Sequence, residues 1–139
     1  MKELHVPSLS TDKIEIMSFE QTLQEEKTIT HDYDTDKWVY LPCRYSEYRY
    51  ILGTKGVNPL VCIGINPSTA SPDDLDNTLK SVERIAHFNG YDSFIMFNVY
   101  AQRATNPDHM DKEFNEMLAE KLPKPGVELM MTLDFDNHK

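Results

Sequence analysis

The sequence predicts an α/β fold in three layers, α/β/α, with a mainly parallel central sheet. This prediction comes from two continuous apolar runs, an amphipathic segment between them, and a polar loop directly after each run. Strands and helices that alternate along a chain pack as parallel strands joined by right-handed crossovers. A length of 139 residues suits one such domain with a single hydrophobic core.

The first part of the chain is polar, acidic and weakly periodic. We expect residues 1–37 to form a poorly defined N-terminal segment, followed by an α/β domain over 38–139. Alternation over 13–19 predicts a short strand, and 19–27 predicts a brief helix. Residues 43–53 are rich in tyrosine and alternate in the way of an antiparallel or edge strand.

The regular elements begin after this stretch. Residues 60–65 form an apolar, β-branched run typical of a strand covered on both faces, and 93–99 predict a second buried strand. Between them, an aspartate should cap a helix that ends at Asn89-Gly90, where glycine permits a left-handed turn. The candidate caps are Asp73, Asp74 and Asp76, and the apolar helix face comprises Leu79, Val82, Ile85 and Ala86. Later patterns predict a second helix over 110–122 and a third strand over 127–135.

Composition limits the function. The formal net charge of −9 opposes a broad duplex-binding face, because Lys and Arg must neutralise phosphates there, although a small basic pocket is still compatible with it. Arginines that could form such a pocket are Arg44, Arg49, Arg84 and Arg103.

Without a signal peptide or a bilayer-length apolar stretch, we expect a cytoplasmic protein that does not bind membranes. The histidines are scattered, so we expect no metal site, and no motif indicates a cofactor.

Polar residues gather where both apolar runs end. Asn66 follows the first run and Asn98 closes the second, and ligands of open α/β sheets bind outside the carboxyl ends of the strands. Backbone N–H groups ahead of a helix can also hold an anion. We therefore predict a pocket at this edge of the sheet. Its candidate residues are Asn66, Pro67, Ser68, Thr69, Asp76, Thr78, Asn98, Tyr100, Arg103 and Thr105.

Each candidate also has a structural interpretation. Asn66 could hold its own turn, and Ser68 or Thr69 could cap the helix. Asp76 and Thr78, at the start of the helix, could cap it as well. Arg103 is the best anion clamp, because its planar fork engages paired oxygens, but a surface ion pair with Asp108 or Asp111 is equally consistent with the sequence. Tyr100 could stack on a base, but an aromatic residue at a strand end more often belongs to the hydrophobic core.

Three stretches carry a specific resemblance, with the sequences YRYILG, GINPSTASPDDLDNTLKSVERIAHFNGYD and FNVYAQRATNP. They place N-P-S-T-A before N-x-x-x-x-R-A-T-x-P, and from about residue 38 to about residue 122 the chain resembles domain of unknown function 1643, a bacterial and phage family. This family has no established activity. Its members carry a later G-x-P-x-H-P-L-Y segment that this chain lacks, so we expect the family pattern to be incomplete at the C-terminus.

A more distant resemblance concerns uracil-DNA glycosylases. G-I-N-P-S is similar to the G-I-N-P-G loop of the mismatch-specific branch, and residues 97–107 are similar to a strand and loop of the iron–sulfur branch. The resemblance implies a glycosylase-like fold in which Asn66 orients the attacking water. It also implies that Ser68, Thr69 and Arg103 contact phosphate or base. Ser68 replaces a glycine of that pattern, and the cluster cysteines are absent.

Three functions are compatible with these observations. The first is a nucleotide- or nucleobase-binding pocket that, if active, hydrolyses an N-glycosidic bond, with single-stranded nucleic acid among the candidate substrates. The second is a non-catalytic module that binds a nucleotide or another anion. The third is a phage-type inhibitor whose acidic N-terminal segment binds a protein partner.

Overall fold

The computed structural model describes residues 4–7 and 17–109. In chain order the elements are α1 (Phe19–Glu26), β1 (Trp38–Leu41), β2 (Ile51–Thr54), β3 (Pro59–Gly64), α2 (Asn77–Phe88), β4 (Ser93–Asn98) and the 3-10 helix η1 (Pro107–His109). The helix expected over 110–122 and the strand expected over 127–135 lie outside the described residues. In the described part, no helix has the length and apolar character needed to cross a membrane.

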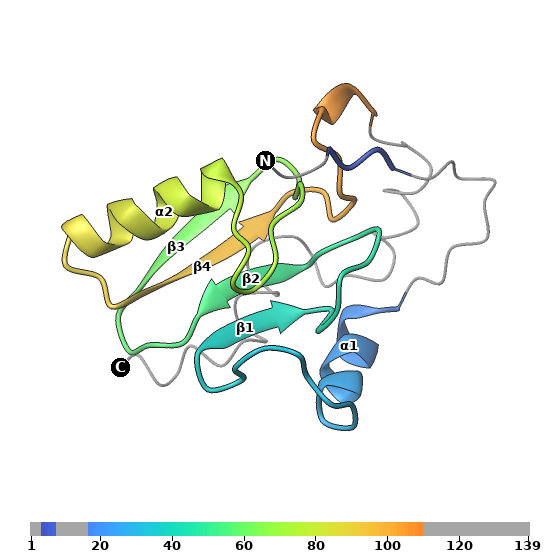
Figure 1. Cartoon of the computed structure of the whole chain (residues 1–139), viewed down its shortest axis with the longest axis horizontal. Helices are drawn as coiled ribbons and strands as arrows, with labels where there is room; N and C mark the ends of the chain where they lie inside the picture. Colours follow the sequence, from blue (N-terminus) through green and yellow to red (C-terminus); the bar gives the residue numbers. More distant parts are fainter. Residues whose placement is uncertain (1–3, 8–16, 110–139) are drawn as a thin grey trace.

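The strands form one mixed sheet with the order β1-β2-β4-β3 (Figure 1). The parallel pairing expected for the two apolar runs is confirmed, because β3 and β4 pair from Pro59↔Ser93 to Gly64↔Asn98. The β1–β2 and β2–β4 pairs are antiparallel, so the prediction of a mainly parallel sheet in a three-layer, glycosylase-like arrangement is not confirmed. What the structure shows is a mixed α/β fold with one four-stranded sheet and two α-helices in its described part.

The antiparallel half of the sheet comes from the tyrosine-rich stretch. Only the last residues of the strand predicted over 43–53 join β2, and the rest is the loop that connects β1 to β2. Its tyrosines hold the N-terminal segment: the Tyr50 hydroxyl donates to the Met17 carbonyl (2.6 Å), and the Tyr48 hydroxyl accepts from the Met17 N–H (2.8 Å). The alternation therefore reflects alternate anchoring side chains in a loop, and not a long strand.

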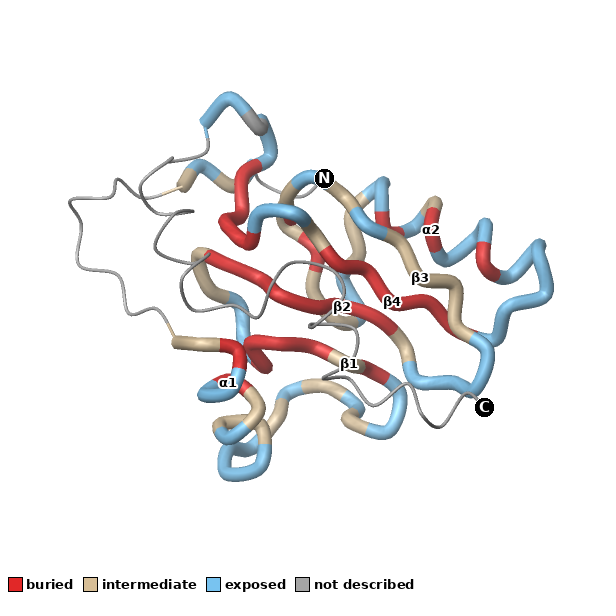
Figure 2. The backbone as a smooth tube through the Cα atoms, turned by 180° about the vertical axis from the view of Figure 1, so that it is seen from behind, coloured by how far each residue is buried: buried red, intermediate tan, exposed pale blue. Residues whose placement is uncertain are grey.

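Hydrophobic side chains pack on both faces of the sheet. In β4, Phe94 and Met96 face α2, whereas Ile95 and Phe97 face the other way, where Phe19 of α1 packs. Figure 2 shows the resulting continuous buried path along β2 and β4 at the centre of the sheet. The expected helix over 19–27 is thus confirmed as α1, and its first residue is part of the core. The expected strand over 13–19 lies mostly outside the described residues.

α2 has the predicted ends. Asp76 is the cap that the structure selects, because its carboxylate accepts from the Leu79 N–H (2.9 Å), and the helix stops at Asn89, followed by Gly90 with φ of 81°. The expected inward position of Ile85 is wrong, since its side chain is 52% exposed. The buried stripe runs through Leu79, Val82 and Ala86, and Ile85 lies beside it on the solvent flank.

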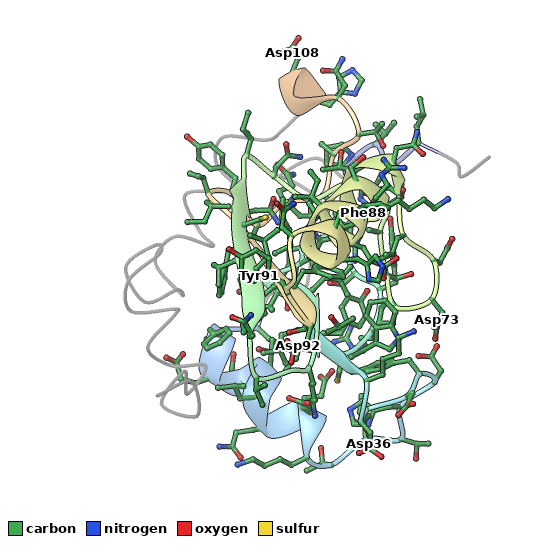
Figure 3. All side chains as sticks on the ribbon, turned by 90° about the vertical axis from the view of Figure 1, so that its left-hand side faces the viewer. Asp36, Asp73, Phe88, Tyr91, Asp92 and Asp108 are labelled. Atoms are coloured by element: carbon green, nitrogen blue, oxygen red, sulfur yellow. The ribbon has the colours of Figure 1, made fainter. Side chains whose placement is uncertain are left out.

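Among the described residues, the cover predicted for both faces of β3 is only partial, with Val61 packed against the core on the face opposite α2. Leu60 and Cys62 pack toward α2, but Ile63 on the other face is 58% exposed. The reason is that β3 lies at the edge of the sheet and α2 covers only one side of it. At the start of β3, the Asp92 carboxylate accepts from two backbone N–H groups of the preceding turn, at 2.9 Å each, which ties this turn to the start of β4 (Figure 3).

The close approach of β2 and β4 gives a testable prediction at Gly53. A Cβ atom at this position would lie 2.3 Å from the Phe94 carbonyl oxygen and 2.8 Å from the Ile95 Cα. Both are backbone atoms that cannot turn aside, so we expect Gly53→Ala to lower the free energy of unfolding by about 3 kcal/mol. Urea denaturation measures this change.

The matched control is Gly90→Ala. No atom lies within 4 Å of the added methyl group, and the left-handed backbone there costs only about 1–2 kcal/mol. Equal losses for the two variants would contradict the steric explanation.

Candidate functional site

The loops that follow β3 and β4 lie side by side, as their parallel pairing requires. Backbone hydrogen bonds continue past the strand ends, from the Tyr100 N–H to the Ile65 carbonyl (2.8 Å) and from the Ala104 N–H to the Pro67 carbonyl (2.9 Å). These contacts place the two polar loops predicted from the sequence at one edge of the sheet. Pro67 is buried there, whereas Tyr100 is 45% exposed.

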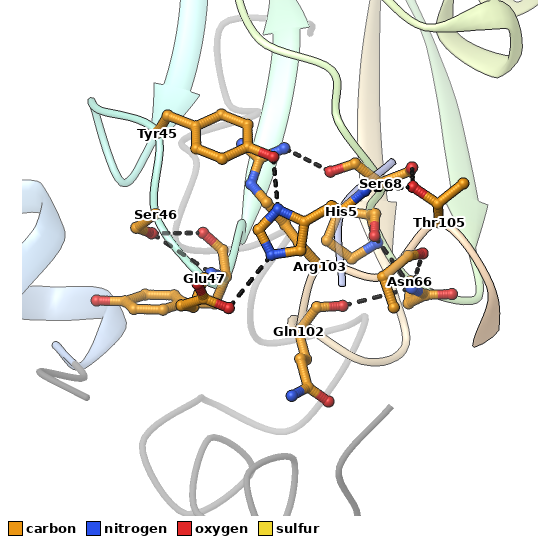
Figure 4. Close-up of polar contacts among 12 residues, drawn as sticks. His5, Tyr45, Ser46, Glu47, Asn66, Ser68, Gln102, Arg103 and Thr105 are labelled. Carbon is orange, nitrogen blue, oxygen red and sulfur yellow. Dashed lines mark hydrogen bonds and ion pairs between the residues drawn. The ribbon is translucent and has the colours of Figure 1, made fainter. Parts of the chain in front are cut away.

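Asn66 joins the two loops. Its side-chain Nδ2 donates to the carbonyls of Pro67 (3.0 Å) and Ala104 (2.9 Å), with the carbonyl of Gln102 further away at 3.4 Å (Figure 4). An amide group has only two N–H donors, so these carbonyls occupy its donor capacity. The geometry therefore corresponds to the structural interpretation of Asn66, as a residue that fixes the path of both loops.

Asn98 has a different environment. Its side-chain nitrogen and oxygen are both buried, and neither has a hydrogen-bond partner among the described residues. The side chain lies over Gly64, where an added Cβ would meet Asn98 Oδ1 at 2.8 Å. Neither Asn98 nor Asn66 lines the cavity described next. Among the described residues, the two amides therefore do not share this cavity, and a common polar pocket of Asn66 and Asn98 stays a prediction.

A cavity of about 850 Å³ lies between the start of α2 and the two loops. Its lining residues are Leu4, Ser68, Thr69, Asp74, Leu75, Asp76, Asn77, Thr78, Lys80 and Thr105. The structure thus brings together five of the predicted site residues: Ser68, Thr69, Asp76, Thr78 and Thr105. Lys80 was missed because it lies on the exposed face of α2, although its place one turn after the capping aspartate could have indicated it.

Most of the lining residues are polar, and four of them carry hydroxyl groups. Ser68 Oγ and Thr105 Oγ1 lie 2.9 Å apart and hold the loops together at the cavity wall. Asp76 uses its carboxylate to cap α2, so the positive end of a 12-residue helix dipole also faces this region. Hydroxyls, a helix N-terminus and the Lys80 ammonium favour an anionic group, whereas the carboxylates of Asp74 and Asp76 oppose it.

Arg103 lies behind the cavity wall and is fully buried. Its Nη1 donates to the carbonyls of Ser68 (2.6 Å) and Ala70 (2.9 Å), and its Nη2 donates to the Tyr40 hydroxyl (2.9 Å). The guanidinium also stacks on the Tyr45 ring, 3.9 Å from its centroid. Arg103 is therefore neither a clamp in direct contact with the cavity nor a surface partner of an aspartate.

Arg49 is a second buried guanidinium at the same place. It is 1% exposed, and its Nη1 lies 3.4 Å from the Ala70 carbonyl that Arg103 also binds. The pKa of Arg49 falls to about 9, mainly through burial and next through the positive charge of Arg103, while Asp76 opposes the shift. Of the four arginines that could have formed a basic pocket, the structure brings these two together; Arg44 instead pairs with Glu25 (3.1 Å).

His5 belongs to this region although nothing near it in the sequence indicates so. Its Nδ1 lies 2.6 Å from the Tyr45 hydroxyl, and its Nε2 lies 3.2 Å from Glu47 Oε2 (Figure 4). Its backbone N–H donates to Thr105 Oγ1 (2.8 Å). These contacts join residues about 40 and 100 positions apart, which no local pattern encodes. In the described part of the chain, no group of His, Cys, Asp and Glu is arranged to hold a metal ion.

Comparison with known proteins gives one finding. The model of a family described as "Protein of unknown function (DUF1643)" matches residues 49–124, more than half of the chain. No curated protein and no solved structure matches. The matched region contains both buried arginines, the loop from Asn66 to Ala70 and α2.

The loop-joining role of Asn66 is testable by its removal. Asn66→Ala leaves the Pro67 and Ala104 carbonyls without the amide donors, so we expect a loss of about 1–3 kcal/mol in the free energy of unfolding. Urea denaturation measures it. As a control, Asn58→Ala removes only an exposed contact of 3.5 Å and should cost less than about 0.5 kcal/mol. If both variants are as stable as the wild type, Asn66 does not hold the loops.

Proposed function

Because the chain belongs to the family of domain of unknown function 1643, whose description gives no activity, we propose a function from the site itself. The cavity at the start of α2 binds a small ligand that carries a phosphate group, such as a nucleotide. The proposal corresponds to the binding functions considered from the sequence. N-glycosidic hydrolysis finds little support, because the Asn66 amide nitrogen is engaged with backbone carbonyls and the residue does not line the cavity.

The observation that carries the proposal is the excess of buried positive charge behind the cavity. Arg49 and Arg103 share the Ala70 carbonyl, and Asp76 is the carboxylate whose charge acts on both of them. Only Ser68 lies between Arg103 and the cavity, since the Ser68 carbonyl accepts from Arg103 and Ser68 itself lines the cavity. Buried charges are screened less than exposed ones, so this excess favours an anion on the other side of the loop.

Size and charge restrict the ligand further. A volume of about 850 Å³ lies within the usual range of small-molecule sites, roughly 300–1,000 Å³. The net charge of −9 and the acidic residues at the cavity disfavour a long nucleic acid, which needs many phosphate contacts. A mononucleotide needs only one such contact region. An inhibitor role for the acidic segment 1–37 stays a prediction from composition.

Lys80 provides the first test of ligand binding. Its ammonium is the cation among the cavity-lining residues, so we expect Lys80→Ala to weaken ADP binding about tenfold, which is about 1.4 kcal/mol. Isothermal titration calorimetry measures the affinity, with adenosine and pyrophosphate as separate ligands to identify the group that is recognised. Lys55→Ala, at an exposed position after β2, is the control and should bind like the wild type. Absence of binding by every phosphate compound would reject the proposal.

Substitution of Arg49 distinguishes a role in ligand binding from a role in the stability of the fold. A buried guanidinium with a lowered pKa is unfavourable for folding, so Arg49→Met should leave the melting temperature unchanged or raise it. The same substitution removes half of the buried positive charge and should weaken ADP binding several-fold. Thermal unfolding and calorimetry on one protein preparation measure both effects. A variant that binds ADP as well as the wild type would show that this charge does not serve the ligand.

A further inference from the structure

Tyr45, His5 and Glu47 form a continuous hydrogen-bonded row beside the cavity (Figure 4). The Tyr45 hydroxyl lies 2.6 Å from His5 Nδ1, and Glu47 Oε2 lies 3.2 Å from His5 Nε2. Tyr45 and Glu47 come from the loop between β1 and β2, whereas His5 comes from the N-terminal segment. The proposed ligand binding does not use these three side chains.

The chemistry of the row fixes the direction of its protons. An ionised carboxylate only accepts hydrogen bonds, so the imidazole must donate from Nε2 to Glu47. A neutral imidazole then has its lone pair at Nδ1, where it accepts the proton of the Tyr45 hydroxyl. A hydroxyl, a base and a carboxylate that orients the base are the parts of an activated nucleophile.

The surroundings of Tyr45 suit a nucleophile. The residue is 49% exposed, so a reactant can reach it, while the His5 side chain is only 10% exposed. The Arg103 guanidinium lies against its ring at 3.9 Å, where a positive charge stabilises the phenolate. The pKa of Tyr45 is raised overall by burial, and the charge of Arg103 only partly offsets this rise, so the phenol needs a base beside it to react.

A purely structural explanation does not need the imidazole. The N-terminal segment is already fixed by its backbone, because the His5 N–H donates to Thr105 Oγ1 (2.8 Å) and the Thr105 N–H donates to the His5 carbonyl (3.0 Å). Thr105 Oγ1 also contacts Ser68 Oγ at 2.9 Å, and both residues line the cavity. The row therefore adjoins the proposed phosphate site through Thr105, and the segment does not need the three side chains to stay in place.

We propose that Tyr45 is a nucleophile toward phosphate esters, with His5 as its general base and Glu47 as a positioning residue. The Tyr45 oxygen forms a bond to phosphorus while the bond between phosphorus and the leaving oxygen breaks. The Tyr45 proton passes to His5 Nδ1 and from there to the leaving oxygen. The product is a phosphotyrosyl ester and a free alcohol, which accounts for every atom and needs no further reactant.

The test uses a dialkyl fluorophosphate, in which fluoride replaces the leaving oxygen. Tyr100 is the internal control, because it is 45% exposed and no described residue hydrogen-bonds to its hydroxyl. Peptide mass spectrometry over time gives the labelling rate at each tyrosine. In the wild-type protein we expect Tyr45 to react at least tenfold faster than Tyr100, and Tyr45→Phe to remove the fast adduct.

Variants of His5 and Glu47 then distinguish a role of His5 as general base from a purely structural role. His5→Asn keeps the backbone contacts of the segment but has no basic nitrogen, so the Tyr45 rate should fall to that of Tyr100. Glu47→Gln should slow labelling about tenfold, and Glu47→Asp should recover part of the rate. Equal rates at the two tyrosines of the wild type would overturn the proposal, and this comparison needs no variant to fold. A Tyr45 rate unchanged by His5→Asn, in a variant with the melting temperature of the wild type, would overturn it as well.

Discussion

Burial of the Arg103 guanidinium is the constraint on which the site depends. In the described part of the chain no carboxylate pairs directly with this cation, so its donors must be satisfied by neutral oxygens. Two carbonyls of the loop after β3 and the hydroxyl of Tyr40 accept from its two Nη groups, Nε has no partner among the described residues, and the Tyr45 ring covers one face. One side chain thus fixes the loop after β3, strand β1 and the β1–β2 loop relative to one another.

The same arrangement supports the proposed binding of an anion in this region. Carbonyls turned toward the buried arginines leave the hydroxyls of Ser68 and Thr69 at the cavity, next to the N-terminus of α2. A second guanidinium, Arg49, adds a charge that contributes nothing evident to stability, because burial makes its protonated form unfavourable. Retaining such a charge is reasonable where a bound anion compensates for it.

The N-terminal segment completes the site from a distance. His5 bonds Tyr45, Glu47 and Thr105, and the neighbouring Leu4 lines the cavity. The site is therefore assembled from the N-terminal segment, the β1–β2 loop and the two loops at the ends of the parallel strands. The family match begins at residue 49, so it covers the two loops and α2 but not Leu4, His5, Tyr45 or Glu47.

The sequence alone determined three features: α1, the parallel pair β3 and β4, and α2 with its aspartate cap and its glycine stop. It also determined that the two polar loops meet, because parallel neighbouring strands end at the same edge. Five cavity-lining residues followed from that rule. Each of these features depends on side chains close together in the chain, where periodicity and capping act.

Tertiary structure alone decided which polar groups are buried and which meet. The tyrosine-rich stretch has the alternation of a strand, but its side chains are fixed by distant partners such as Met17 and Arg103, so it forms a loop. Arginine side chains usually lie at the surface, yet carbonyls from another loop allow the complete burial of Arg103. His5 meets Tyr45 only after folding, because a hydrogen bond between distant residues depends on the packing of whole elements and leaves no periodic trace in the sequence.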